Sequence, residues 1–267
     1  MRNLPAFLLA LAALLVPAGA ASATVVCTVI EDVATGATVH REGACEERRS
    51  PMSTFKLPLA LMAADAGIVM SPQQPRMEYR PEFAGPERVR KPVDPAVWMR
   101  ESILWYSQAL TRRLGPYKLR AYVDGFGYGN RDLSGNRGKN DGLTQAWLMS
   151  SLEISADEQV AFVRSFLTRA FPVSPDAYDL ATELVPVFPA ADGWTVRGKT
   201  GSGWLRKPSG AVDRTRPLGW FVGWAEKGER RLAFARLVIG DRPNEQPGGF
   251  VARDGFIAEL PGFLAPR

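Results

Sequence analysis

Histidine and cysteine are almost absent from this 267-residue sequence, which contains a single histidine, His40, and two cysteines, Cys27 and Cys45. Two thiolates and one imidazole are too few for the four-ligand set of an ordinary structural zinc site. His40 lies in a predicted strand with no evident carboxylate partner, so the sequence does not favour a Ser-His-Asp mechanism. We therefore expect no metal, and an activated serine would need a lysine or a carboxylate as its base.

Long apolar runs and blocks of one charge are also missing. After the first 23 residues, no stretch approaches the roughly eighteen apolar residues of a membrane-spanning helix. Lysine and arginine exceed aspartate and glutamate by 33 to 28, but they are scattered among the acidic residues. These absences argue against a stable membrane anchor, and nothing in the sequence indicates nucleic-acid binding.

The N-terminus has the pattern of a secretory signal peptide. Arg2 supplies the positive charge, residues 6–16 are apolar, and residues 21–23 (Ala-Ser-Ala) form a small-residue cleavage site. The apolar segment is too short to span a bilayer comfortably, and an uncleaved anchor is the alternative. We expect residues 1–23 to be removed and the mature protein to be exported to the periplasm.

The predicted export bears on the two cysteines. Cys27 and Cys45 lie on either side of a predicted hairpin, and two cysteines in an oxidising compartment most simply form one bridge. A loop of this size would stabilise the fold by about 3 kcal/mol in the chain-entropy model. Two free thiols are the alternative.

Strand patterns occur at both ends of the chain, and helical patterns occur between them. The sequence contains no internal repeat and no low-complexity segment. We therefore predict a single domain of residues 24–267 in the α/β class (α+β type), with an antiparallel sheet built from both termini and an inserted helical region. The predicted strands are residues 24–32, 38–41, 194–204, 219–226 and 231–239. The predicted helices are residues 51–66, 95–114 (one helix or two), 118–124, 143–152, 156–170, 175–184 and 252–260.

A hydroxyl and an amine lie three residues apart at the start of the first predicted helix. Ser50 followed by Pro51 is typical of an N-cap and the first helical position. Ser53 and Lys56 would then share one helix face, with Lys56 as the base of a nucleophilic serine if its ammonium is lost or masked. A capped helix with a solvated lysine is the alternative, because S-x-x-K often arises by chance.

A second candidate is Lys199-Thr200-Gly201 within a predicted strand. Lys199 supplies a positive charge, Thr200 a hydroxyl donor, and Gly201 lets a substrate approach the strand closely. Taken alone, these residues also fit an ordinary surface strand. Together with the upstream S-x-x-K, they indicate a serine β-lactamase or a penicillin-binding protein.

Two further features are ambiguous when taken alone. Tyr128-Gly129-Asn130 lies in a glycine-rich loop and has ordinary turn chemistry. Ser102 lies within an apolar segment predicted to be helical, where its hydroxyl would bond either a backbone carbonyl or another residue of the site.

The order and spacing of these motifs resemble those of the class D serine β-lactamases (oxacillinases). The likeness extends over nearly the whole mature chain and implies the serine β-lactamase/penicillin-binding-protein transpeptidase fold, with the site in a cleft between a helical and a mixed α/β region. The surrounding segments that also fit are residues 102–108 (SILWYSQ), 142–148 (GLTQAWL) and 219–224 (GWFVGW).

The resemblance also implies catalytic roles. Ser53 matches the acylated nucleophile, and Lys56 matches the lysine that this class carries as N6-carboxylysine, made from CO₂ or bicarbonate, with no other cofactor. Trp147 matches the tryptophan whose indole N–H holds that carbamate, and Ser102 matches the serine that passes a proton to the leaving nitrogen.

Substrate contacts are implied in the same way. Lys199, Thr200 and Gly201 would meet the carboxylate of a small β-lactam substrate, and Arg253 is a weaker match to an arginine that often binds the same group. Tyr128 is a further expected substrate-binding residue. The backbone N–H groups of Ser53 and Ser202 would form the oxyanion hole.

Physical chemistry makes the assignment of Lys56 coherent. A lysine is ordinarily a cation at neutral pH, but apolar surroundings lower its pKa by desolvation. Phe55, Leu104 and Trp147 would supply such surroundings. The neutral amine can then react with CO₂, and the indole N–H can hold the resulting anion.

Leu104 departs from the class D pattern, which usually has valine at this position. The bulkier side chain would lie against the carbamate and change the rate of deacylation or the substrate range. A D-alanyl-D-alanine peptidase and a penicillin-binding sensor are the alternative functions. The sequence defines neither the oligomeric state nor the range of β-lactams hydrolysed.

Overall fold

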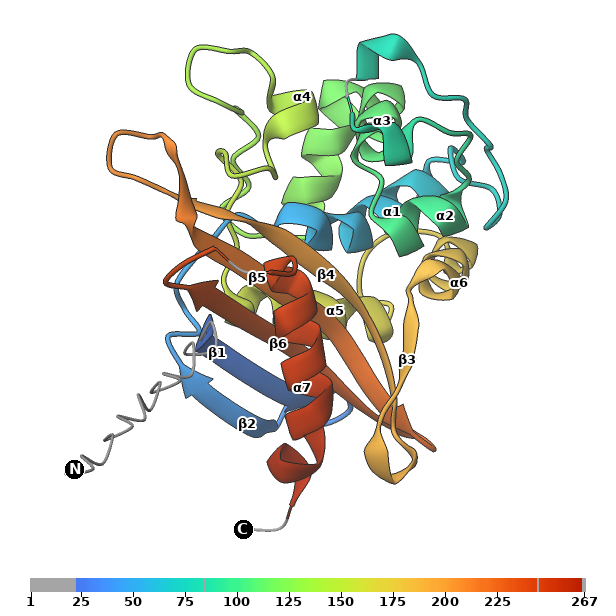
Figure 1. Ribbon diagram of the computed structural model, residues 1–267. Helices are drawn as coiled ribbons and strands as arrows, with labels where there is room; N and C mark the ends of the chain where they lie inside the picture. The colour runs from blue at the N-terminus through green and yellow to red at the C-terminus, as the bar shows by residue number, and fades with distance from the viewer. Residues whose placement is uncertain (1–22, 84, 244, 266–267) are drawn as a thin grey trace, which may run out of the picture.

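Strands from both ends of the chain form one antiparallel sheet in the computed structural model, which describes residues 23–83, 85–243 and 245–265. N-terminal β1 (Ala23–Asp32) pairs with β2 (Thr38–Gly43) on one side and with C-terminal β6 (Arg230–Gly240) on the other. This pairing confirms the predicted sheet. The strand order is β2-β1-β6-β5-β4-β3 (Figure 1), and the other strands are β5 (Val212–Lys227), β4 (Thr195–Arg206) and β3 (Val187–Pro189).

Helices cover both faces of the sheet. The C-terminal helix α7 (Gly248–Leu264) crosses one face, where the ring of Phe256 stacks on Phe234 of β6 at 3.9 Å between centroids (Figure 1). Helix α5 (Ala156–Leu167) packs on β1 and β6 from the other side. The remaining helices form the inserted region: α1 (Lys56–Asp65), α2 (Pro95–Glu101), α3 (Leu104–Gly125), α4 (Gly142–Gln145) and α6 (Pro175–Leu184), with short 3₁₀ turns at Met52–Phe55, Pro81–Phe83, Glu87–Val89 and Ala191–Gly193.

Local sequence signals explain several helix boundaries. Ser155 and Glu158 form a reciprocal capping box at the start of α5, with backbone-to-side-chain distances of 3.1 and 2.9 Å. The predicted break at Gly115 is present as a kink within α3, because Gly115 adopts a φ of 74° and is followed by Pro116.

Other predictions of secondary structure were wrong in detail. Within the predicted helix of residues 143–152, α4 ends at Gln145 and the following residues form turns. Residues 95–114, for which one or two helices were predicted, contain two, α2 and the first part of α3, separated at Ser102 with left-handed dihedrals (φ 60°, ψ 38°). The short edge strand β3 was not predicted.

The predicted disulfide is confirmed. Cys27 of β1 is bonded to Cys45, with 5.0 Å between their Cα atoms, and both residues are fully buried. The bridge ties β1 to the chain segment that leads toward Ser53.

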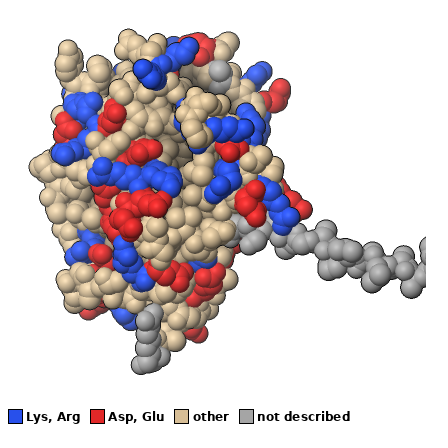
Figure 2. Space-filling view, turned by 90° about the vertical axis from the view of Figure 1, so that its left-hand side faces the viewer, with Lys and Arg blue, Asp and Glu red and all other residues tan. Residues whose placement is uncertain are grey.

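The predicted signal peptide falls almost entirely on residues 1–22, which lie outside the described residues. Within the part that the structure describes, no helix is long and apolar enough to cross a bilayer. Figure 2 shows lysine and arginine interspersed with aspartate and glutamate on one face, in agreement with the scattered charges of the sequence.

Candidate active site

Ser53 lies on a tight 3₁₀ turn (Met52–Phe55) that leads directly into α1. The preceding residue, Met52, has a φ of 54°, which is uncommon for a residue other than glycine. The hydroxyl of Thr54 donates to the carbonyl of Pro51 at 2.7 Å and accepts a hydrogen bond from the amide of Gln159 at 2.9 Å. These bonds hold the turn from within and connect it to α5.

Ser50 does not cap the helix, contrary to the prediction. The residue that caps the 3₁₀ turn is Pro51, and no side chain provides a capping hydrogen bond there. The Ser50 hydroxyl instead donates to the carbonyl of Trp147 at 2.8 Å and accepts from the N–H of Met149 at 2.8 Å. Ser50 therefore ties the segment before Ser53 to the segment that contains Trp147.

Lys56 and Ser53 meet as the i, i+3 spacing predicts. The ammonium nitrogen Nζ of Lys56 lies 3.2 Å from Oγ of Ser53, and Lys56 is only 1% exposed. Burial lowers the pKa of Lys56 well below its usual value, and the charge of nearby Lys199 lowers it further. A neutral amine is thus favoured next to the serine hydroxyl, and the alternative of a solvated surface lysine is wrong.

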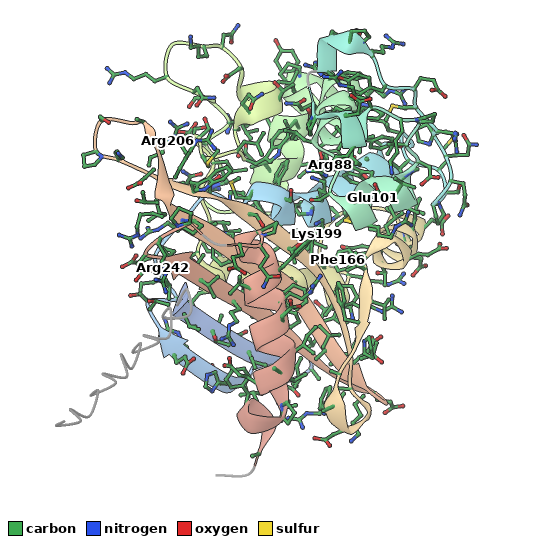
Figure 3. All side chains as sticks on the ribbon, in the orientation of Figure 1. Arg88, Glu101, Phe166, Lys199, Arg206 and Arg242 are labelled. Carbon is green, nitrogen blue, oxygen red and sulfur yellow. A yellow bond between two sulfur atoms is a disulfide. The ribbon has the colours of Figure 1, made fainter. Side chains whose placement is uncertain are left out.

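Strand β4 carries Lys199, Thr200 and Gly201 to the same place. Gly201 lies so close to the serine turn that a Cβ atom there would be 2.8 Å from the carbonyl oxygen of Pro51. Lys199 is 2% exposed, and its Nζ donates to the carbonyl of Thr200 at 3.0 Å. Figure 3 shows Lys199 between the sheet and the inserted helices.

The N-terminal end of α7 packs on the next residue of β4. The N–H of Gly249 donates to Oγ of Ser202 at 2.9 Å, and a Cβ atom at Gly249 would lie 2.7 Å from the carbonyl of Gly201. This contact places Arg253, about one turn along α7, near Lys199. Burial and then the charge of Arg253 lower the pKa of Lys199 to about 7.

Trp147 forms one wall beside the serine turn. Its ring stacks on Phe55 with 5.0 Å between centroids, and Trp147 is 1% exposed. The buried indoles of Trp98, Trp105 and Trp220 each donate to an oxygen atom. By contrast, among the described residues no acceptor is bonded to the Trp147 indole. Its N–H is therefore available to an additional acceptor.

The chain matches the model of the penicillin binding protein transpeptidase domain over residues 23–256. It is 49% identical to β-lactamase OXA-9 of Klebsiella pneumoniae over 246 residues, which are 91% of this chain and 90% of that protein. It is 33% identical to β-lactamase OXA-1 of Escherichia coli, covering 88% of this chain and 83% of that protein. The crystal structure of the OXA-427 class D β-lactamase superposes with a TM-score of 0.83 and 40% identity, covering 90% of this chain and 98% of that one.

This chain belongs to the class D β-lactamases. The family resemblance seen in the motifs and the predicted fold are thereby confirmed.

Ser102 lies in a different backbone setting from the one predicted for this class D chain. It occupies the left-handed junction between α2 and α3 rather than the interior of a helix. Its hydroxyl has no hydrogen-bond partner within the described residues, so neither of the two predicted bonds, to a backbone carbonyl or to another residue of the site, is present there. A non-glycine residue in this conformation is uncommon and is often found at functional sites.

Two other predicted site residues lie in unexpected surroundings. Tyr128 is 1% exposed and packs edge-on against Phe55, and its hydroxyl donates to Gln159 at 3.4 Å. Such complete burial does not fit a substrate contact, and Tyr128 instead packs against the serine turn through Phe55. Leu104 is 38% exposed at the start of α3, and its place against the carbamate stays a prediction.

Gln159 and Gly249 were not identified as site residues from the sequence. Gln159 lies on the buried face of α5, where its amide bonds the hydroxyl of Thr54. A polar residue on the apolar face of a predicted helix was the available signal. For Gly249, the signal was the pair Gly248-Gly249 at the start of a helix, where glycine permits close contact with a neighbouring strand.

Proposed function

We propose that this class D β-lactamase hydrolyses the β-lactam ring of penicillin-type antibiotics through an acyl-enzyme on Ser53, with the Lys56 side chain as general base, and so confers resistance. The observation that carries the mechanism is the buried Lys56 Nζ at 3.2 Å from Ser53 Oγ. His40 cannot serve as the base, because it lies on β2 and its ring packs on Phe263 of α7, away from the serine turn.

The residues around Lys56 fit the N-carboxylated form of the side chain. The pKa of Lys56 is lowered by burial, so the amine is available in the neutral form that reacts with CO₂. The indole N–H of Trp147 has no acceptor among the described residues and can donate to an anion at this place. Carboxylation supplies an anionic oxygen base one turn from Ser53, whereas an ammonium could not accept a proton.

Acylation begins with attack of Ser53 Oγ on the β-lactam carbonyl carbon. The Lys56 side chain takes the hydroxyl proton, and the carbonyl electron pair moves onto oxygen. The backbone N–H groups of Ser53 and Ser202 are proposed to stabilise this oxyanion. As the carbonyl re-forms, the C–N bond of the ring breaks and Ser102 passes its proton to the leaving nitrogen. Ser102 takes up in turn the proton that the Lys56 side chain removed from Ser53, so the base is free again for deacylation.

Deacylation uses the same base. The Lys56 side chain removes a proton from water, and the hydroxide formed attacks the acyl carbon of the ester. The C–O bond to Ser53 then breaks and Oγ regains its proton. This step distinguishes a β-lactamase from a sensor or a peptidase, in which the acyl-enzyme formed with penicillin persists.

Substrate binding is assigned to the cationic side of the site. Lys199 and Arg253 are proposed to attract the substrate carboxylate, and Thr200 to donate its hydroxyl to the same group. The side chain of Arg253 is 24% exposed, so it is partly accessible to a ligand. Export to the periplasm, which the N-terminal sequence predicts, is part of the proposed function.

Hydrolysis of a chromogenic cephalosporin by the purified mature protein, with and without added bicarbonate, tests this proposal. We expect multiple turnovers that rise with bicarbonate, and none in the matched Ser53→Ala variant. A single stoichiometric burst that bicarbonate cannot rescue would contradict the proposal and favour the sensor or the peptidase.

A further inference from the structure

Arg206, the last residue of β4, joins three segments through one guanidinium group. Its Nε donates to the carbonyl of Met149, its Nη1 to the carbonyl of Gly210, and its Nη2 to Oδ1 of Asn136 at 2.9 Å. Figure 3 shows Arg206 at the base of the hairpin that joins β4 to β5. One side chain thus fastens this hairpin to the loop before α4 and to the segment just after Trp147.

The bond from Arg206 to Met149 continues as an unbroken series of hydrogen bonds to the serine turn. The N–H of Met149 donates to Oγ of Ser50 at 2.8 Å, and that hydroxyl donates to the carbonyl of Trp147 at 2.8 Å. The same carbonyl accepts the N–H of Met52 at 3.0 Å, directly before Ser53. The series therefore connects Arg206 to the backbone of Trp147 and of Met52, the residue before the nucleophile.

The two methionines in this series have unfavourable backbone conformations. Met149 has a φ of 50° and Met52 a φ of 54°. Left-handed conformations of this kind cost free energy and persist where neighbouring contacts fix them. Two bonds from β4 reach Met149, namely the one from Arg206 and one from the N–H of Trp204 to its sulfur atom at 3.4 Å.

Packing alone does not hold this segment. A cavity of about 290 Å³ lies between the segment after Trp147 and the end of β4, and Met52, Met149 and Arg206 are among its lining residues. Oγ of Ser150 is buried there without a partner in the described part of the chain. Because a cavity removes packing contacts, the position of the segment depends more on its hydrogen bonds.

We propose that Arg206 is a positioning residue that holds Trp147 beside Lys56 and so retains the carboxylated state of Lys56. This role rests on the proposed function, because it assumes that Lys56 is carboxylated. Arg206 acts through the Met149 carbonyl and touches neither the substrate nor the reacting atoms. Loss of its guanidinium would let the segment move and withdraw the indole N–H from the Lys56 side chain.

The Arg206→Ala variant is expected to require about tenfold more bicarbonate for half-maximal turnover, the size of effect typical of residues that orient a ligand through another group. The acylation burst should be kept, because the turn itself is also held by Thr54 and Gln159. Arg206→Lys, which keeps a cationic donor, should recover part of the loss. Lys207→Ala is the matched control, since it removes a cation from the same turn, and in the part of the chain that the structure describes its side chain makes no hydrogen bond.

The decisive experiment is ¹³C NMR of each protein in ¹³C-labelled bicarbonate, which detects the carbamate without turnover. We expect a carbamate signal in the wild type and in Lys207→Ala, and a weaker one in Arg206→Ala at equal bicarbonate. An equal signal in Arg206→Ala would overturn the role of Arg206 while leaving the proposed function intact. Absence of the signal in the wild type would overturn the carboxylated base itself. If Arg206→Ala does not fold, Arg206→Gln, which keeps one amide donor, is measured in its place and read in the same way.

Discussion

Lys56 and Lys199 are both buried in one site, and the charge of Lys199 bears on Lys56. Lys199 lowers the pKa of Lys56, and both side chains are at most 2% exposed. Among the described residues neither is paired with a carboxylate. Unpaired buried ammonium groups are costly, so burial is the main cause of the lowered pKa of both amines. A lowered pKa at Lys56 favours the neutral amine that the proposed reaction with CO₂ needs.

Replacement of Lys56 by alanine should abolish turnover while the protein still folds. Loss of a general base lowers rates by about a hundredfold to ten-thousandfold, and no other base lies next to Ser53 in the proposed mechanism. The buried amine is not needed for stability, so thermal unfolding should occur at an equal or higher temperature. Steady-state hydrolysis together with a melting curve checks both outcomes. Wild-type hydrolysis by Lys56→Ala would contradict the assignment of the base.

Replacement of Trp147 by phenylalanine isolates the indole N–H from the ring. The stack on Phe55 can remain, whereas the donor proposed to hold the Lys56 carbamate is lost. A hydrogen bond to a charged group contributes about 2 kcal/mol, so the bicarbonate requirement should rise by about thirtyfold. Turnover measured over a range of bicarbonate concentrations tests this expectation.

Trp224→Phe is the matched control for Trp147→Phe. Trp224 is equally buried, and its indole donates to Glu226 at 3.2 Å, near the far end of β5 from Ser202. Loss of the Trp224 indole N–H should leave the bicarbonate requirement unchanged. Equal requirements in Trp147→Phe and the wild type would show that the indole N–H does not hold the base.

The sequence predicted those parts of the fold that depend on local patterns. Alternating and β-branched residues located the long strands, and Ser155 with Glu158 marked the start of α5. The pairing of β1 with β6 followed from strand patterns at both ends of the chain. The spacing of Ser53 and Lys56 predicted their contact correctly, because residues three apart share a face even when the first turn is 3₁₀.

Long-range hydrogen bonds account for what the sequence could not reveal. The predicted helix after Gln145 stops because the Trp147 carbonyl accepts from Ser50 and Met52, which lie about a hundred residues earlier. The left-handed backbone of Ser102 has no signature in the residue types around it. Ser50, which has the residue type of a helix cap, uses its hydroxyl for tertiary contacts instead.

The pH dependence of kcat/KM should report the titration of Lys199. Its pKa is about 7 in the free protein, so its positive charge is lost, and attraction of an anionic β-lactam weakens, as the pH rises through this value. Arg253 is one cause of the lowered pKa, since like charges disfavour protonation. Arg253→Ala should therefore move the falling limb of the profile to higher pH.

Arg253→Lys is the control for this shift, because it preserves the charge near Lys199. In Arg253→Lys, the fall of kcat/KM should occur at nearly the same pH as in the wild type, even if substrate affinity changes. Profiles of kcat/KM from pH 5 to 10 for the three proteins measure the effect. If kcat/KM fell at the same pH in Arg253→Ala and in the wild type, the electrostatic coupling of Arg253 and Lys199 would be refuted.

Removal of the Cys27–Cys45 bridge should lower stability without affecting catalysis. The bridge joins residues 18 apart, and closing a loop of this length stabilises the fold by about 3 kcal/mol in the chain-entropy model. The double variant Cys27→Ala/Cys45→Ala should therefore unfold at lower denaturant concentration, while kcat stays within about twofold because neither cysteine contacts the site residues described. Reduced wild-type protein, which keeps both sulfur atoms, separates the loss of the covalent bond from the loss of packing. If the reduced and oxidised proteins had equal free energies of unfolding, the bridge would contribute nothing to stability.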